Sequence, residues 1–162
     1  MGSKYFKKKR TNKNLLKANK VISISSQLER LMNSFPNLQI EKSSDKEFIV
    51  IVKLRPHIFS KEYDVKIVYE LGNQVSVFIV NEKLKIAKNR TKLPHVWDNE
   101  LQKICLYSKQ EGGSWSSEKS IASTIVPWAS EWLYYYEIWL IDGLWYGGGH
   151  DEYINENELK NE

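Results

Sequence analysis

The residues best suited to covalent chemistry surround Cys105, the single cysteine of the chain. His95 precedes it by ten residues, and Trp115 opens a Trp-Ser run with Ile121 six residues further on. A thiolate is strongly nucleophilic, and its thioester stays reactive toward amines, so a cysteine can carry an acyl group between partners. The competing interpretation is a small buried core residue, because cysteine is among the residue types most often buried and aliphatic residues flank this one.

Charged side chains near Cys105 are candidates to assist such chemistry. An unperturbed thiol has a pKa of about 8.5, and Lys92 or Lys103 would favour the thiolate if either lay close in space. Asp98 and Glu100 are candidates to orient or deprotonate an incoming amine. The alternative is that both carboxylates are ordinary solvated loop charges, which is the commoner situation for either one alone.

The spacing of His95 and Cys105 resembles that of ubiquitin-conjugating enzymes, whose His-Pro-Asn motif places a histidine ten residues before the catalytic cysteine. These enzymes also have a leucine after the cysteine, like Leu106, and a Trp-Ser-Pro segment with an isoleucine at the offset that separates Trp115 from Ile121. The resemblance implies that Cys105 is the nucleophile on an exposed loop edge. It also implies that His95 is chiefly structural and braces that loop.

One departure from the family concerns the oxyanion that forms during acyl transfer. The Pro-Asn of the motif is replaced here by Val96-Trp97, and the resemblance gives that asparagine the role of supporting the loop and stabilising the oxyanion. A preorganised oxyanion donor is worth about 2.7–4 kcal/mol of barrier. The substitutes available nearby are Asn99, Gln102, His95 and backbone N–H groups, and sequence alone does not choose among them. We name Cys105, His95 and Asn99 as the candidate catalytic set.

The C-terminal segments sharpen the resemblance. Residues 125–137 and 143–150 are similar to small stand-alone conjugating-enzyme-like proteins of bacterial CBASS (cyclic-oligonucleotide-based antiphage signalling) operons, and the similarity covers residues 24–150. This resemblance implies that Cys105 forms a thioester with the C-terminal residue of a cGAS/DncV-like nucleotidyltransferase and passes it to an amine acceptor. The nucleotidyltransferase would take the part of ubiquitin.

The hydrophobic pattern predicts the elements that position these residues. Apolar positions every three or four residues predict a helix from Ser23 to Phe35, which Pro36 ends. Short turns between runs of β-forming residues then predict a four-stranded antiparallel meander. This order matches an α+β, ubiquitin-conjugating-enzyme-like fold with the cysteine segment and C-terminal helices following the sheet. The expected strands are residues 38–42, 48–54, 63–71 and 74–80.

Helical periodicity returns after the cysteine segment, from Ile121 to Trp139. Ser116 or Ser117 is the expected N-cap, and Gly143 suits the C-terminal end. Proline is not tolerated in a helix interior, so residue 127 predicts a kink or a fresh helix start. The spacing of Trp128, Trp132 and Trp139 predicts packing against the sheet rather than a ligand box.

Length and charge suggest one domain with two charged extensions. At 162 residues the chain suits a single domain, which we place at residues 21–150. Eight lysines and arginines without any acid predict a disordered basic arm over residues 1–20, and residues 151–162 form an acidic tail. No apolar run approaches the roughly 20 residues that span a bilayer, and one cysteine cannot form an internal disulfide. We therefore expect a cytoplasmic protein.

Two other functions remain open beside the conjugating enzyme. The first is a catalytically inactive adaptor of the same fold, which the missing asparagine permits. The second is nucleic-acid binding through the basic arm, which predicts a steep salt dependence that deletion of residues 1–20 removes. His57 and His150 show no ligand spacing with Cys105, so we expect neither zinc nor a cofactor. Residues 147–149, three glycines without the Lys and Ser/Thr of a P-loop, predict a chain reversal.

Removing the basic arm should leave the fold intact. Its eight like charges and few apolar residues cannot bury enough surface to offset the entropy of ordering it. We expect a chain lacking residues 1–20 to melt within a few degrees of the full chain in a thermal denaturation followed by circular dichroism. A drop of many degrees would show that the arm packs on the domain.

Overall fold

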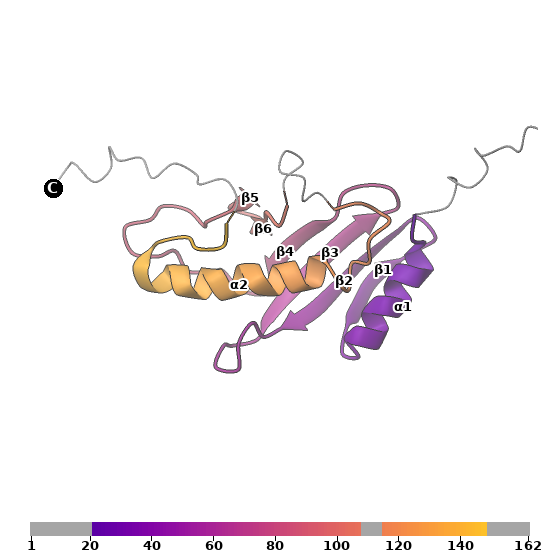
Figure 1. Cartoon of the computed structure of the whole chain (residues 1–162), viewed down its shortest axis with the longest axis horizontal. Helices are drawn as coiled ribbons and strands as arrows, with labels where there is room; N and C mark the ends of the chain where they lie inside the picture. The colour runs from indigo at the N-terminus through magenta and orange to yellow at the C-terminus, as the bar shows by residue number, and fades with distance from the viewer. Residues whose placement is uncertain (1–20, 108–114, 149–162) are drawn as a thin grey trace, which may run out of the picture.

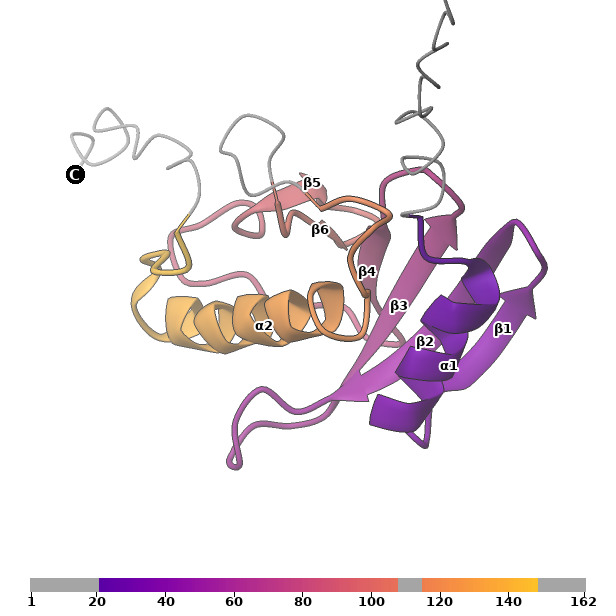
Figure 2. The same ribbon diagram turned by 45° about the vertical axis from the view of Figure 1, so that its right-hand side comes forward.

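The computed structural model describes residues 21–107 and 115–148, which form a mixed α and β domain with a six-stranded antiparallel sheet and two helices. In both ribbon views α1 lies over β1 and β2, whereas α2 lies toward the β4 end of the sheet, below β5 and β6 (Figure 1; Figure 2). The elements are α1 (Ile24–Ser34), β1 (Gln39–Ser43), β2 (Glu47–Leu54), β3 (Tyr63–Glu70), β4 (Ser76–Val80), β5 (Val96–Asp98), β6 (Lys103–Ile104) and α2 (Ile125–Asp142).

The first four strands form the expected antiparallel meander. Period-two alternation places the apolar side chains of the central strands on one buried face. Cross-strand pairs such as Phe48 with Tyr69 and Val50 with Ile67 pack together on that face. The prediction of four strands was nevertheless incomplete, because the sheet order is β1-β2-β3-β4-β6-β5. The segment that carries the cysteine folds into a hairpin and adds two strands next to β4. The candidate site is thus built on the end of the sheet.

Helix α1 confirms the expected first helix and contains an unexpected buried polar residue. Ser23 caps the helix by accepting a hydrogen bond from the N–H of Ser26 at 3.3 Å. Gln27 is fully buried; its Nε2 donates to the carbonyl of Lys119, and its Oε1 accepts from the N–H of Ile121, both at 2.9 Å. Because a buried amide needs such partners, Gln27 fixes α1 to the segment that precedes α2.

Helix α2 begins later than predicted. Residues 116–124 form turns, Thr124 is the N-cap, and Pro127 lies in the first turn, where the missing N–H costs nothing. The expected cap at Ser116 or Ser117 is therefore wrong, and the prediction of a fresh start near the proline is right. Gly143 ends the helix in the left-handed conformation with φ +74°, as expected. A single helix, rather than several, follows the cysteine segment within the described residues.

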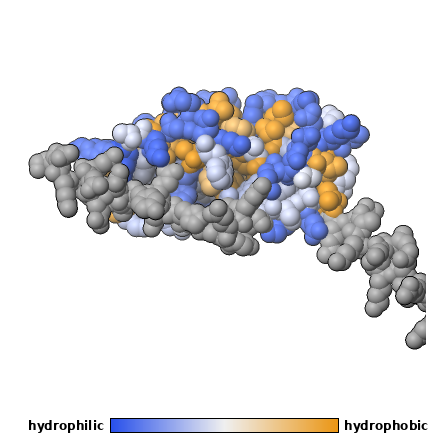
Figure 3. All heavy atoms as spheres, turned by 90° about the horizontal axis from the view of Figure 1, so that it is seen from above, coloured by the Kyte–Doolittle hydropathy of each residue, from blue (hydrophilic) through white to orange (hydrophobic). Residues whose placement is uncertain are grey.

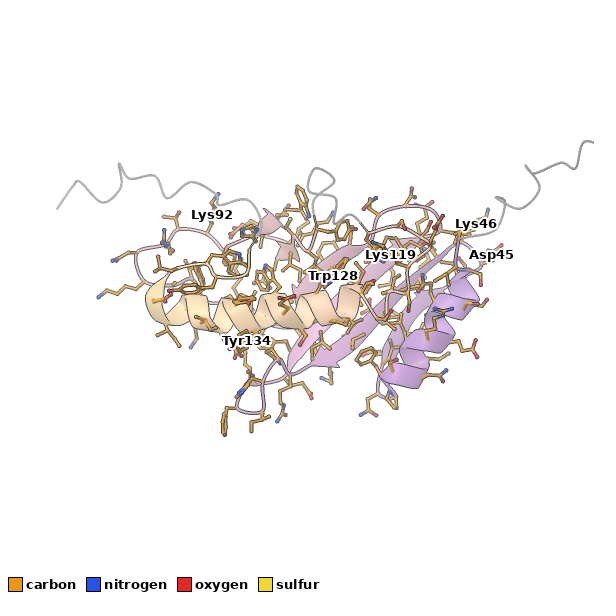
Figure 4. The ribbon with its side chains drawn as sticks, in the orientation of Figure 1. Asp45, Lys46, Lys92, Lys119, Trp128 and Tyr134 are labelled. Carbon is orange, nitrogen blue, oxygen red and sulfur yellow. The ribbon has the colours of Figure 1, made fainter. Side chains whose placement is uncertain are left out.

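The tryptophan stripe of α2 is largely core. Trp132 and Trp139 are buried, whereas Trp128 is half-buried and packs against Tyr107 with ring centroids 6.2 Å apart. Figure 4 places Trp128 on the side of α2 that faces β5 and β6, and Tyr134 on the opposite side. One face of α2 therefore supports the sheet end that carries the hairpin.

Three sequence-based expectations lie outside the described residues: the basic arm, the acidic tail and His150. Neither helix in the described part of the chain is long and apolar enough to cross a membrane.

Candidate active site around Cys105

The β5–β6 hairpin brings His95 and Cys105 together. Val96 pairs with Ile104 across the hairpin, and just beyond that pair the N–H of Cys105 donates to the carbonyl of His95 at 2.9 Å. Lys103 of β6 pairs in turn with Phe78 of β4, which attaches the hairpin to the sheet. The ten-residue spacing seen in the sequence is therefore the span of this hairpin.

Cys105 lies at the border of the core rather than inside it. Ile104 is buried, while Cys105 is half-buried, as alternation along an extended chain predicts. The thiol lies 3.9 Å from the carbonyl oxygen of Tyr107 and donates to it. The Tyr107 hydroxyl accepts from the N–H of Val75 and donates to its carbonyl, both at 3.0 Å, and burial raises the pKa of this phenol. The segment after the cysteine is thus pinned to the residue that precedes β4.

His95 is held in a strained backbone conformation by three contacts. Its φ of +43° is uncommon for a residue with a side chain, and such conformations persist only where the surroundings enforce them. Its carbonyl oxygen accepts from the N–H of Cys105 and from the indole N–H of Trp132 at 3.1 Å. Its ring stacks on Trp145 with centroids 5.1 Å apart and an interplanar angle of 23°. These contacts fix the position of the His95 carbonyl beside Cys105.

Asn99 connects the turn of the hairpin with the segment that precedes β5. Its Oδ1 accepts from the N–H of Leu93 at 2.8 Å, and its carbonyl accepts from the N–H of Gln102 at 3.4 Å. Asp98 contributes to the same turn by accepting from the N–H of Leu101 at 2.8 Å. The Asn99 amide therefore has a fixed orientation through its oxygen.

Gln102 has a structural role, which removes it from the candidate oxyanion donors. Its side chain is buried, and its Nε2 donates to the carbonyls of Ile79 and Glu82, each at 2.9 Å. Its Oε1 accepts from the N–H of Leu84 at 2.7 Å. Both amide hydrogens are already engaged, so Gln102 anchors the loop after β4.

The charged candidates around Cys105 mostly resemble ordinary loop charges. Glu100 forms an exposed ion pair with Lys83 at 3.3 Å, and Asp98 caps the hairpin turn. The Nζ atom of Lys103 lies 5.9 Å from the ring centroid of Phe78, within the range of a cation–π contact. Lys92 lies in the segment before β5, on the side of the molecule that carries the hairpin (Figure 4).

The surface of the hairpin is partly apolar. Trp97 and Leu101 leave 64% and 63% of their surface exposed, although both lie within a few residues of the site. Seen from above, this side of the molecule mixes apolar and hydrophilic side chains (Figure 3). Residues 21–107 and 115–148 contain no group of three or more His, Cys, Asp or Glu side chains that could hold a metal ion.

Sequence reasoning missed two residues that shape this site. Tyr107 was not singled out, although its position two residues after Cys105 made it a natural neighbour. Trp145 was not singled out either, and no local signal links it to His95, which lies fifty residues earlier. Trp132 was assigned to the core, and its indole N–H also reaches the site.

Comparison with known proteins gives a family for the chain. The curated proteins contain no match to it. A family model described as "Type II CBASS E2 protein" matches residues 27–152, which is most of the chain and includes the hairpin, Cys105 and α2. The family is one of CBASS antiphage defence and of E2-like, conjugation-type proteins. The chain belongs to the type II CBASS E2 protein family.

Proposed function

We propose that this protein is a conjugating enzyme in which Cys105 carries an acyl group as a thioester. The single observation that carries the proposal is the placement of Cys105 at the border of the core, directly after β6, with its N–H on the carbonyl of His95. A half-buried thiol at the end of a short hairpin can meet a partner's chain terminus, which a thiol in a strand interior cannot. The match to an E2-type family supports this assignment of the cysteine.

The reaction has two acyl-transfer steps. The Cys105 thiolate attacks the carbonyl carbon of an activated acyl donor, an acyl adenylate or a thioester, and expels its leaving group. An acceptor amine then attacks the Cys105 thioester; the amine loses a proton, an amide bond forms and the thiolate is released. In the resting protein the carbonyls of His95 and Tyr107 hold the backbone N–H and the thiol of Cys105 in place.

The proposed acyl donor is the C-terminus of a cGAS/DncV-like nucleotidyltransferase, and the acceptor is a protein amine. Membership of a CBASS family supports a partner from the same defence system, and a nucleotidyltransferase is the partner that the sequence resemblance implies. The exposed side chains of Trp97 and Leu101 offer apolar surface on the hairpin for an incoming tail.

The test is a pair of gels. The purified protein is incubated with its candidate nucleotidyltransferase, ATP and cell extract to supply the activation step, and then run with and without a thiol reductant. A thioester predicts a shifted band that the reductant removes. A complete absence of any shifted band would favour the inactive adaptor, and a band that resists the reductant would indicate another linkage.

Asn99 is the proposed oxyanion donor. Its Oδ1 accepts from the N–H of Leu93, so the Nδ2 group on the other branch of the amide is the one that would donate to the oxyanion. Asn99→Asp keeps an acceptor for that N–H but removes the donor, whereas Asn99→Ala removes both. If Asn99 stabilises the oxyanion, both variants should slow transfer from a preformed thioester by about 10²–10³-fold.

Alkylation of Cys105 by iodoacetamide is the control for the Asn99 variants, because that reaction needs no oxyanion donor. Its rate should stay near that of the wild type once the pH is high enough to ionise the thiol fully. Wild-type transfer by Asn99→Asp, with loss only in Asn99→Ala, would show that Asn99 merely braces the loop.

A further inference from the structure

The segment after α2 folds back onto the candidate site through one side chain. Trp145 is half-buried, and its ring contacts Trp132 and Tyr135 at centroid distances of 5.8 and 6.1 Å besides stacking on His95. Its indole N–H donates to the carbonyl of Gly148 at 3.0 Å. The indole is therefore clamped between α2, the β5–β6 hairpin and its own following backbone.

Gly147 makes this fold-back possible. A Cβ atom at this position would lie 2.5 Å from Cζ2 and 2.8 Å from Cε2 of Trp145, distances that Cβ contacts essentially never show. Unlike Gly148, whose φ is +70°, Gly147 does not have the left-handed backbone that favours glycine. The requirement for glycine at position 147 is therefore the space occupied by the indole ring.

We infer that Trp145 and Gly147 are positioning residues for Cys105, acting through His95. The strained backbone of His95 presents one carbonyl to both Cys105 and Trp132, and the stack of Trp145 on its ring stabilises that conformation. When the indole is displaced, the hairpin end opens more often and exposes the thiol. The inference deepens the proposed function, on which the catalytic meaning of Cys105 rests, but its geometry does not depend on any partner.

The main test is the rate at which iodoacetamide alkylates Cys105 in the full chain, because this reaction needs no partner protein. The loss of an aromatic contact of this kind shifts an equilibrium by about two- to tenfold. Here the equilibrium is that between the closed and the opened hairpin end. Gly147→Ala should therefore raise the alkylation rate by about two- to tenfold, because the thiol is half-buried and held by the Tyr107 carbonyl in the closed hairpin and is more exposed in the opened one. Transfer of the acyl group, which needs the closed geometry, should fall by a similar factor.

A double-mutant cycle separates the proposed mechanism from general loosening. If Gly147→Ala acts by displacing the indole, then adding it to Trp145→Ala should change the alkylation rate by less than about 1.5-fold. Trp145→Phe keeps an aromatic ring over His95 and should restore most of the wild-type rate. Should Trp145→Ala fail to fold, Gly147→Ala is compared with Trp145→Phe instead. The inference then requires a raised alkylation rate in Gly147→Ala and a rate near that of the wild type in Trp145→Phe.

Gly72→Ala is the matched control. Gly72 lies in the turn between β3 and β4 with φ +84°, and a Cβ there meets no atom within 4 Å, so alanine adds backbone strain without touching the site. Its alkylation rate should equal that of the wild type. Three results would overturn the inference: a wild-type rate in Gly147→Ala, an undiminished effect of Gly147→Ala beside Trp145→Ala, or equal acceleration by Gly72→Ala. Because none of these involves an acyl adduct, the proposed function can fail without this inference failing.

Discussion

Cys105→Ala is expected to abolish adduct formation completely while changing the free energy of unfolding by less than about 1 kcal/mol. The loss follows because no other thiol exists in the chain. The small stability change follows because the side chain is only half-buried and its removal leaves little cavity. Adduct formation is measured on non-reducing gels, and stability by urea denaturation.

The neighbouring residue provides the control for Cys105→Ala. Ile104 is buried in the core, so Ile104→Ala should cost about 2–5 kcal/mol. The two adjacent substitutions should therefore separate packing from chemistry. If Cys105→Ala destabilises the domain as much as Ile104→Ala does, the cysteine is a core residue and the conjugating mechanism is wrong.

The second large effect is expected on stability. Trp139 is buried in α2, with its ring centroid 6.1 Å from that of Tyr136, and Trp139→Ala should lower the free energy of unfolding by about 3–5 kcal/mol. That is a large share of the 5–15 kcal/mol typical of a domain. Chemical denaturation monitored by far-ultraviolet circular dichroism measures it.

Ile141→Ala is the matched control for Trp139→Ala. Ile141 lies on the same helix but exposes 86% of its surface, so its replacement should change stability by no more than about 0.5 kcal/mol. A fully stable Trp139→Ala variant that no longer binds its partner would show instead that the tryptophan belongs to an interface.

Elements with strong local periodicity could be predicted from the sequence. Ser23 and Pro36 bracket α1, and the alternation from Tyr63 to Glu70 identifies β3, because these signals depend only on nearby residues. Strands β5 and β6 could not be found in the same way, since three and two residues are too few to show a period. The early start expected for α2 arose because Ile121 fits a helical stripe while lying in a turn.

The candidate site, like the fold, could be predicted from the sequence only in part. Cys105, His95 and Asn99 could be nominated because residue type and spacing already imply chemistry. The structure brings the first two together and gives the third a bracing hydrogen bond. Gln102 could not be removed from the open candidates by sequence, because the burial that makes its amide a structural anchor depends on the loop after β4. The contact of Trp145 with His95 could not be predicted for a similar reason, because it forms only where the chain returns to the hairpin after α2.

The most direct measurement is the identity of the bond in the adduct. Cys105→Ser should convert the labile thioester into an ester that survives reductant, because an oxygen ester resists thiols. After this adduct is purified and digested, mass spectrometry should find the peptide containing position 105 joined through its new hydroxyl to the C-terminal peptide of the nucleotidyltransferase. If the partner's C-terminus is instead joined to another residue of this chain, while position 105 is unmodified, Cys105 is not the acyl carrier.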